Sequence, residues 1–237
     1  MSKILVTGAA SGLGLAIATA LAARGHTVIG YDRAAYAGNA GDPIVADVRD
    51  PDPIHIRDLC NEELDVLINC AGVNIIGWLE DFSGAQWDLV MDVNAKGIFK
   101  MSQLCLPMLA KSKGTIVNIV SNAAHMPMTC SLAYNASKGA AHIMTLQLAR
   151  ELTKKWGITV FGIAPNKLKG TGMSDAIDEQ VVATRGWTKE QAVAYQLQGL
   201  LAGEETPPYA VAELLAYLLS SKETHKFLTG TVIPYGA

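Results

Sequence analysis

The stretch KILVTGAASGLG at residues 3–14 decides the fold. A short apolar run leads directly into a glycine-rich turn, and an apolar segment of helical length begins inside that turn. Glycines let the backbone bend tightly and approach a pyrophosphate, and a helix N-terminus offers free N–H groups with partial positive charge. An ordinary strand-to-helix turn is the alternative, because glycine-rich strings also occur there. We expect a dinucleotide to be bound by Gly8, Ser11, Gly12, Leu13 and Gly14.

Short runs rich in Val and Ile alternate with helical segments along the rest of the chain. These runs are continuously apolar, which indicates strands buried on both faces of a parallel sheet. The expected strands are 3–7, 27–31, 43–46, 65–69, 114–120, 158–163 and 230–233, and the expected helices are 12–24, 52–60, 84–111, 132–156 and 207–220. The pattern predicts an α/β fold, a doubly wound and mostly parallel seven-stranded sheet with helices on both faces. We expect a single domain over 1–237, with a substrate lid in the long stretch at 166–206 that lacks strand signals.

Composition excludes several classes of protein. Half of the 237 residues are apolar and 17% are charged, which is typical of a globular chain and not of a disordered one. The net charge of −3 argues against a nucleic-acid partner. Four scattered cysteines and five unpaired histidines suggest neither a disulfide framework nor a metal site. The apolar stretch 13–23 is too short to span a membrane, so we expect a cytoplasmic protein without a membrane partner.

An acidic residue ends the second expected strand. Asp32 follows Gly14 by 18 residues, close to where an acid accepts hydrogen bonds from an adenosine ribose. A carboxylate there repels a 2′-phosphate, which favours NAD over NADP, although the neighbouring Arg33 weakens that preference. A solvated carboxylate at a strand end is the alternative. The next strand ends carry further candidate cofactor residues, namely Asp47, Val48, Asn69, Ala71 and Gly72.

A phenol and an ammonium stand four residues apart at Tyr134 and Lys138, so they share one face of the expected helix. Ser121 closes the preceding strand and can reach the same sheet edge. The spacing alone is also compatible with a helix-surface pair.

These motifs together resemble the short-chain dehydrogenase/reductase family over nearly the whole chain. The family's glycine pattern matches Thr7 to Gly14, its Asn-Ala-Gly motif matches Asn69, Ala71 and Gly72, and its Tyr-x-x-x-Lys matches Tyr134 and Lys138. The resemblance implies a Rossmann fold, hydride transfer between a nicotinamide and a carbonyl or secondary alcohol, and a homotetramer or dimer.

The resemblance also implies the catalytic residues. Tyr134 is the acid or base, Ser121 binds the substrate oxygen, Lys138 lowers the phenol pKa and binds the nicotinamide ribose, and Asn94 holds a water beside Lys138. A phenol has an unperturbed pKa of about 10, so a base at neutral pH needs about 4 kcal/mol of stabilisation of its anion.

The chain departs from the family after the sixth strand, where Asn166 replaces the usual Gly behind Pro165. We expect Asn to tolerate the left-handed backbone of that turn, and we assign Pro165 and Thr171 to the cofactor. The neighbouring Lys167 and Lys169 could attract an anionic substrate, but charged loop side chains are usually simply exposed.

We expect a largely apolar substrate pocket. Its expected substrate residues are Asn74, Ser121, His125, Met126, Tyr134 and Met173, with Ile75, Asn122, Met128, Trp187 and Tyr195 also lining it.

The leading hypothesis is an NAD-dependent alcohol dehydrogenase or ketone reductase acting on a medium-sized, apolar or cyclic substrate. One alternative is a 3-oxoacyl-thioester reductase of the same family. Two others are a non-catalytic dinucleotide-sensing regulator and a methyltransferase, which the pairing of Tyr134 with Lys138 disfavours.

Overall fold

The computed structural model describes residues 1–35 and 44–236. Within them, seven strands form one entirely parallel sheet in the order β3-β2-β1-β4-β5-β6-β7. They are β1 (Lys3–Thr7), β2 (Thr27–Asp32), β3 (Ile44–Val45), β4 (Val66–Asn69), β5 (Thr115–Ile119), β6 (Thr159–Pro165) and β7 (Val232–Tyr235). The chain builds outward from β1 in one direction and then from β4 in the other. This order confirms the predicted doubly wound sheet and places its crevice beyond the carboxyl ends of β1 and β4.

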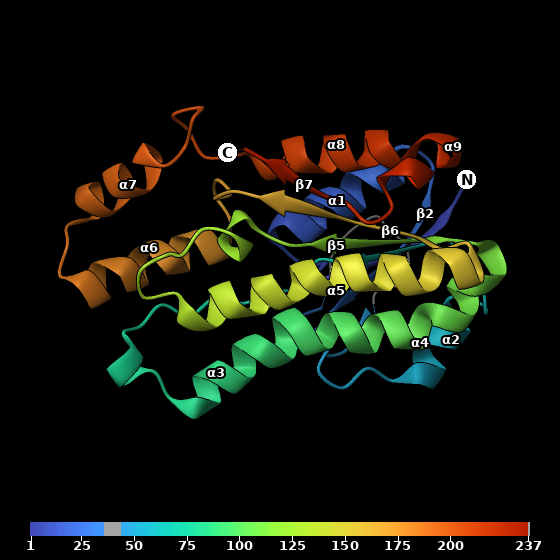
Figure 1. Ribbon diagram of the computed structural model, residues 1–237, viewed down its shortest axis with the longest axis horizontal. Coiled ribbons are helices and arrows are strands. Elements are labelled where there is room, and N and C mark those ends of the chain that lie inside the picture. The colour runs from blue at the N-terminus through green and yellow to red at the C-terminus, as the bar shows by residue number, and fades with distance from the viewer. Residues whose placement is uncertain (36–43, 237) are drawn as a thin grey trace.

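Helices cover both faces of the sheet. They are α1 (Gly12–Ala23), α2 (Pro53–Leu59), α3 (Gly84–Met91), α4 (Gly97–Ser112), α5 (Leu132–Trp156), α6 (Gly172–Arg185), α7 (Lys189–Gln198), α8 (Pro208–Leu219) and α9 (Lys222–His225). Figure 1 shows α1 and α8 on one side of the sheet and α4 and α5 on the other. None of the described helices is both long enough and apolar enough to cross a membrane.

Successive residues of a strand pack into different hydrophobic clusters, one on each face of the sheet. Ile4 and Ile68 pack into the cluster that includes α1 and α8, whereas Leu5 and Leu67 pack into the cluster that includes α4 and α5. Each of these four side chains is fully buried. Because side chains alternate between the faces of a strand, burial on both faces requires the uninterrupted apolar runs seen in the sequence.

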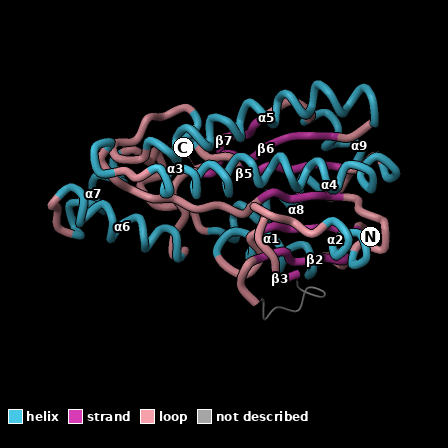
Figure 2. Tube along the Cα trace, turned by 90° about the horizontal axis from the view of Figure 1, so that it is seen from below, coloured by secondary structure: helices cyan, strands magenta, loops and turns pink. Residues whose placement is uncertain are grey.

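Some predicted boundaries were wrong. The predicted helix 84–111 is divided into α3, a π-helical turn (Asp92–Lys96) and α4. The last strand begins at Val232, two residues later than predicted. The stretch 166–206 holds α6 and α7, which project beyond the carboxyl ends of the strands (Figure 2).

Local capping explains both of these extra helices. The Thr171 side chain accepts a hydrogen bond from the Ser174 N–H at the start of α6. Thr188 and Gln191 form a reciprocal capping box at the start of α7. The Thr-x-x-Gln spacing at 188–191 is itself a helix-start signal in the sequence, so the beginning of α7 was predictable.

Candidate active site

A cavity of about 690 Å³ lies at the carboxyl edge of the sheet and extends under α6 and α7. Most of the residues that the sequence assigned to a site line it. These are Gly8, Ser11, Gly12, Leu13, Gly14, Asp32, Asp47, Val48, Ala71, Gly72, Asn74, Ser121, Met126, Tyr134, Lys138, Pro165, Thr171 and Met173. Tertiary structure thus brings segments from the whole chain to one cavity.

The glycine turn is shaped for close backbone contact. Gly8 has a left-handed backbone with φ of 71°, and a Cβ atom added to Gly14 would lie 2.0 Å from the Gly8 carbonyl oxygen. The side chain of Ser11 makes no capping hydrogen bond, so the first N–H groups of α1 keep their capacity for an anion. A Cβ on Gly12 would lie 3.6 Å from the Thr171 side chain, so Thr171 faces the turn. These features fit the pyrophosphate of a dinucleotide.

Acidic residues and arginines lie together in the cavity lining around the end of β2, namely Asp32, Arg33, Asp47 and Arg49. The Asp32 carboxylate accepts hydrogen bonds from the N–H groups of Ala10 and Ala34, each at 3.0 Å. Arg49 pairs with Asp47 at 2.7 Å, and this hydrogen bond lowers the pKa of the Asp47 carboxyl. Asp32 is therefore held in place while retaining further acceptor capacity for a ribose.

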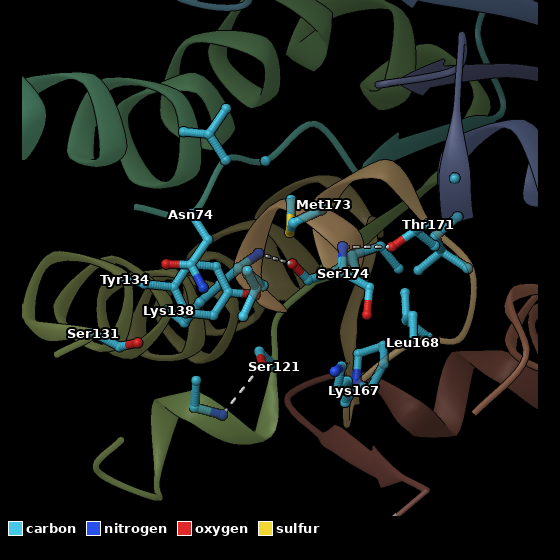
Figure 3. A pocket seen from close by; sticks show the side chains of 18 of the residues that line it. Asn74, Ser121, Ser131, Tyr134, Lys138, Lys167, Leu168, Thr171, Met173 and Ser174 are labelled. Atoms are coloured by element: carbon cyan, nitrogen blue, oxygen red, sulfur yellow. Dashed lines mark hydrogen bonds between the residues drawn. The ribbon is translucent and has the colours of Figure 1, made fainter. Parts of the chain in front are cut away.

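The chemically reactive side chains converge from the segment after β5 and from α5. Figure 3 shows Ser121, Tyr134 and Lys138 around one cavity. The Lys138 ammonium lies 5.8 Å from the centroid of the Tyr134 ring and donates a hydrogen bond to the Ile119 carbonyl at 2.9 Å. The Ser121 hydroxyl caps the following turn by accepting a hydrogen bond from the N–H of Ala123.

Burial governs the titration of both groups. It lowers the pKa of Lys138 to about 8, because an ammonium loses hydration there. It also raises the pKa of the Tyr134 phenol, and the opposing effect of a hydrogen bond with Ser121 is smaller. We expected the neighbouring ammonium to lower the phenol pKa, but in the protein alone the pKa is raised, with desolvation as the largest cause. The phenol therefore holds its proton at neutral pH.

Two predicted asparagines lie behind the cavity. Asn94 is fully buried in the π-helical turn, where it accepts from the Val73 N–H and donates to the Val73 carbonyl and to Ser137. Asn69 donates to the Asn118 side chain at 2.9 Å. Neither lines the cavity. Asn94 instead joins the segment after β4 to α5, beside Lys138.

His125 is not brought to the cavity, although the sequence assigned it to the substrate. Its imidazole Nε2 lies 3.1 Å from Nδ1 of His142 on α5. Met126, the next residue, does line the cavity. Of the other expected lining residues, Ile75 and Trp187 are also absent, whereas Asn122, Met128 and Tyr195 are present.

The residues after Pro165 differ from expectation. Asn166 does not adopt a left-handed backbone. Lys167 is not a solvated loop residue, because its ammonium pairs with Asp178 at 2.6 Å and Glu205 at 2.9 Å, with only 12% of its side chain exposed. Lys169 is exposed, as expected. The Lys167 ammonium thus connects the end of β6 to α6 and to the loop after α7.

Sequence reasoning did not identify Arg49 or Arg185, both of which line the cavity. Arg49 follows Asp47 by two residues, and this spacing was a usable signal for a pair at the strand end. Arg185 stands among many charges in 166–206, and nothing in the local sequence distinguishes it.

Comparison with protein families decides between the alternative interpretations of these motifs. A family model described as short chain dehydrogenase matches residues 2–182. The chain belongs to the short-chain dehydrogenase family. It is therefore an oxidoreductase of the class that acts on carbonyl or CH–OH groups.

Individual members of the short-chain dehydrogenase family cover almost all of the chain. The 3-oxoacyl-[acyl-carrier-protein] reductase of Vibrio cholerae is 30% identical, with 97% of this chain and 93% of the relative covered. The 2,3-dihydro-2,3-dihydroxybenzoate dehydrogenase of Escherichia coli is 28% identical, with coverage of 99% and 96%. A crystal structure from Beutenbergia cavernae with bound NADP has a TM-score of 0.84 and 26% identity, with coverage of 98% and 94%.

Proposed function

We propose that this short-chain dehydrogenase transfers a hydride between NAD(H) and a medium-sized, largely apolar or cyclic ketone or secondary alcohol. The observation that carries the proposal is the convergence of Ser121, Tyr134 and Lys138 on the cavity that also contains the glycine turn. A non-catalytic sensor would need the turn but not a phenol, a hydroxyl and an ammonium around the same space.

The cofactor is assigned to particular residues of the cavity. The turn from Gly8 to Gly14 and the N-terminus of α1 hold the pyrophosphate, and Asp32 holds the adenosine ribose. Lys138 binds the nicotinamide ribose, with Thr171 facing the glycine turn. When bound, the cofactor supplies or accepts the hydride.

The protein's own residues handle the oxygen and its proton. In the reductive direction, Tyr134 donates its proton to the substrate oxygen, and Ser121 donates a hydrogen bond to that oxygen as its negative charge develops. The Lys138 ammonium stabilises the phenolate that remains. Asn94 holds the segment around Val73 against α5, which fixes the position of Lys138.

Asp32 supports NAD over NADP. Its carboxylate would repel a 2′-phosphate at short range, whereas Arg33 and Arg49 nearby would attract one. Asp47 already pairs with Arg49, which reduces the attraction from that side. Because a related structure contains NADP, both cofactors belong in the test.

The cofactor assignment is tested by steady-state reduction of a panel of cyclic and medium-chain ketones with NADH and with NADPH. We expect a higher kcat/KM with NADH. Asp32→Ser should lower the affinity for NADH by about tenfold, the value of one lost charged hydrogen bond, and raise that for NADPH. Preference of the unaltered enzyme for NADPH would contradict the assignment of NAD.

Reduction of a 3-oxoacyl thioester is the second candidate, supported by the similarity to the Vibrio cholerae reductase. Acetoacetyl-coenzyme A separates the two candidates. A kcat/KM for this thioester well above that for every ketone of the panel would favour the thioester reductase.

We also propose that α6 and α7 form the substrate lid, supported by their lining residues Met173 and Tyr195. Assembly as a homo-oligomer is supported by exposed apolar residues on α4 and α5, where Phe99 is 52% and Ile143 is 60% exposed. Light scattering coupled to size exclusion measures the number of subunits, with a monomer as the contradicting result.

A further inference from the structure

The cavity has a cation on α6 that no described acidic side chain neutralises. Arg185, in the last turn of α6, lines the cavity, and its Nη2 donates a hydrogen bond to the Thr129 carbonyl at 3.1 Å. No acidic side chain within the described residues forms an ion pair with it. Among the other cations that line the cavity, Arg49 and Lys167 have carboxylate partners, whereas Arg33 and Lys138 form no ion pair with a described acidic side chain.

Two aromatic rings hold the guanidinium in place. Its Cζ lies 4.6 Å from the centroid of the Trp187 ring and 4.9 Å from that of the Tyr195 ring. The two ring centroids are themselves 5.1 Å apart. Three nearly equal distances place both rings to one side of the guanidinium, so they do not sandwich it. The rings fix the group by cation–π attraction without neutralising its charge.

The hydrogen-bonding capacity of Arg185 is largely unused. A guanidinium has five N–H donors, and the protein accepts one hydrogen bond from it in the described structure. Its Nε is buried and has no hydrogen-bond partner among the described residues. The lining residues of α6 that lie closest to it in sequence are apolar, namely Ile177 and Val181. A partly buried cation beside apolar side chains binds an anion more strongly than one surrounded by water.

We propose that Arg185 binds a carboxylate carried by the substrate. The inference rests on the proposed function and narrows it to carbonyl or alcohol substrates with an apolar body and a carboxylate away from the reacting carbon. The planar fork of a guanidinium matches the two oxygens of a carboxylate. Tyr134 and Ser121 act on the carbonyl while Arg185 fixes the other end of the molecule.

A matched pair of substrates tests this role. The reduction of 4-oxocyclohexanecarboxylate and of its methyl ester is measured at pH 7 in the unaltered enzyme, Arg185→Gln and Arg185→Lys. We expect the Gln variant to lose about 10- to 100-fold in kcat/KM for the acid, mainly through KM, and less than about threefold for the ester. The Lys variant should recover part of the loss. Lys189→Gln, which removes an exposed cation of α7 outside the cavity lining, should change neither.

Other outcomes overturn the inference. Equal losses of kcat/KM for acid and ester in Arg185→Gln would mean that Arg185 only stabilises the α6–α7 segment. Reduction of the ester but not the acid by the unaltered enzyme would lead to the same conclusion. Calorimetric titration of the cofactor-loaded enzyme with cyclohexanecarboxylate measures binding without turnover. Binding that is lost in Arg185→Gln supports the inference, and absence of binding to the unaltered enzyme contradicts it. If no ketone is reduced at all, the proposed function fails while the titration still decides the anion site.

Discussion

The Lys138 ammonium lies 5.8 Å from the centroid of the Tyr134 ring, one helical turn away on α5. Lys138 itself is 5% exposed. In this partly dry site water stabilises a charge on either group less than it would in solution. Burial is the largest cause of the pKa shift of each group, and it favours the neutral phenol and the neutral amine.

Replacing Tyr134 with Phe removes the proton donor and keeps the ring. We expect kcat for ketone reduction to fall by about 10²- to 10⁴-fold, the usual contribution of a general acid. Because the glycine turn and Asp32 still contact the cofactor, the Kd of the cofactor should change by less than about threefold. Absorbance at the reduced nicotinamide band measures the rate, and calorimetry measures the Kd. Unchanged turnover would remove Tyr134 from the reaction.

The pKa of Lys138 sets an upper pH limit. Below about pH 8 the ammonium is charged, and as pH rises through that value the free enzyme loses the positive charge. We expect kcat/KM for ketone reduction to fall about tenfold per pH unit above about pH 8, measured between pH 6 and 10. Lys138→Arg should move this fall to higher pH, because Arg keeps its charge. A flat profile up to pH 10 would contradict the role of this charge.

Gly14 should not tolerate a side chain. In Gly14→Ala the new Cβ would lie 2.0 Å from the Gly8 carbonyl oxygen, so the turn has to move. We expect a loss of about 2 kcal/mol or more in unfolding free energy, typical of overpacking, together with weakened cofactor binding. Urea unfolding and calorimetry measure the two effects.

Gly139→Ala is the matched control for that variant. Gly139 lies inside α5, and no described atom outside its local backbone lies within 4 Å of an added Cβ. Replacing a helical Gly with Ala should stabilise the protein by about 0.5–1 kcal/mol. If Gly14→Ala were as stable as Gly139→Ala, the tight approach at the turn would be refuted.

His225 should make stability depend on pH. It is 4% exposed, its Nε2 lies 2.9 Å from the Thr115 hydroxyl, and burial lowers its pKa below 6.5. As pH falls below about 6.5, the unfolded chain takes up a proton that the folded protein resists, so the free energy of unfolding decreases. His225→Gln should lose less stability between pH 7.5 and 5.5, as measured by urea unfolding. Equal losses in both proteins would contradict this account.

Fold and much of the candidate site follow from local sequence. Continuous apolar runs and the glycine turn at 3–14 predict the parallel sheet, because those patterns depend on the periodicity of single elements. The residues that form the cofactor end, such as Gly8, Gly14 and Asp32, stand at strand ends, and the carboxyl ends of parallel strands meet at one edge. Their convergence was therefore predictable without knowing the packing.

Other features depended on long-range contacts. Lys167 is paired because α6 and the loop after α7 bring Asp178 and Glu205 to it, 11 and 38 positions further along the chain. His125 lies outside the cavity, where its imidazole contacts that of His142 of α5, 17 positions further along the chain.

By itself, the sequence determined the sheet, the glycine turn and the identity of the phenol, ammonium and hydroxyl, because each is encoded within a few neighbouring residues. Tertiary structure alone decided which charges are neutralised and which face the cavity. Arg185 shows the difference, since its carbonyl partner Thr129 is 56 positions away in the sequence and the absence of a described acidic partner follows from the packing around it. The physical reason is that burial and charge pairing are properties of packed neighbours, which no single segment contains.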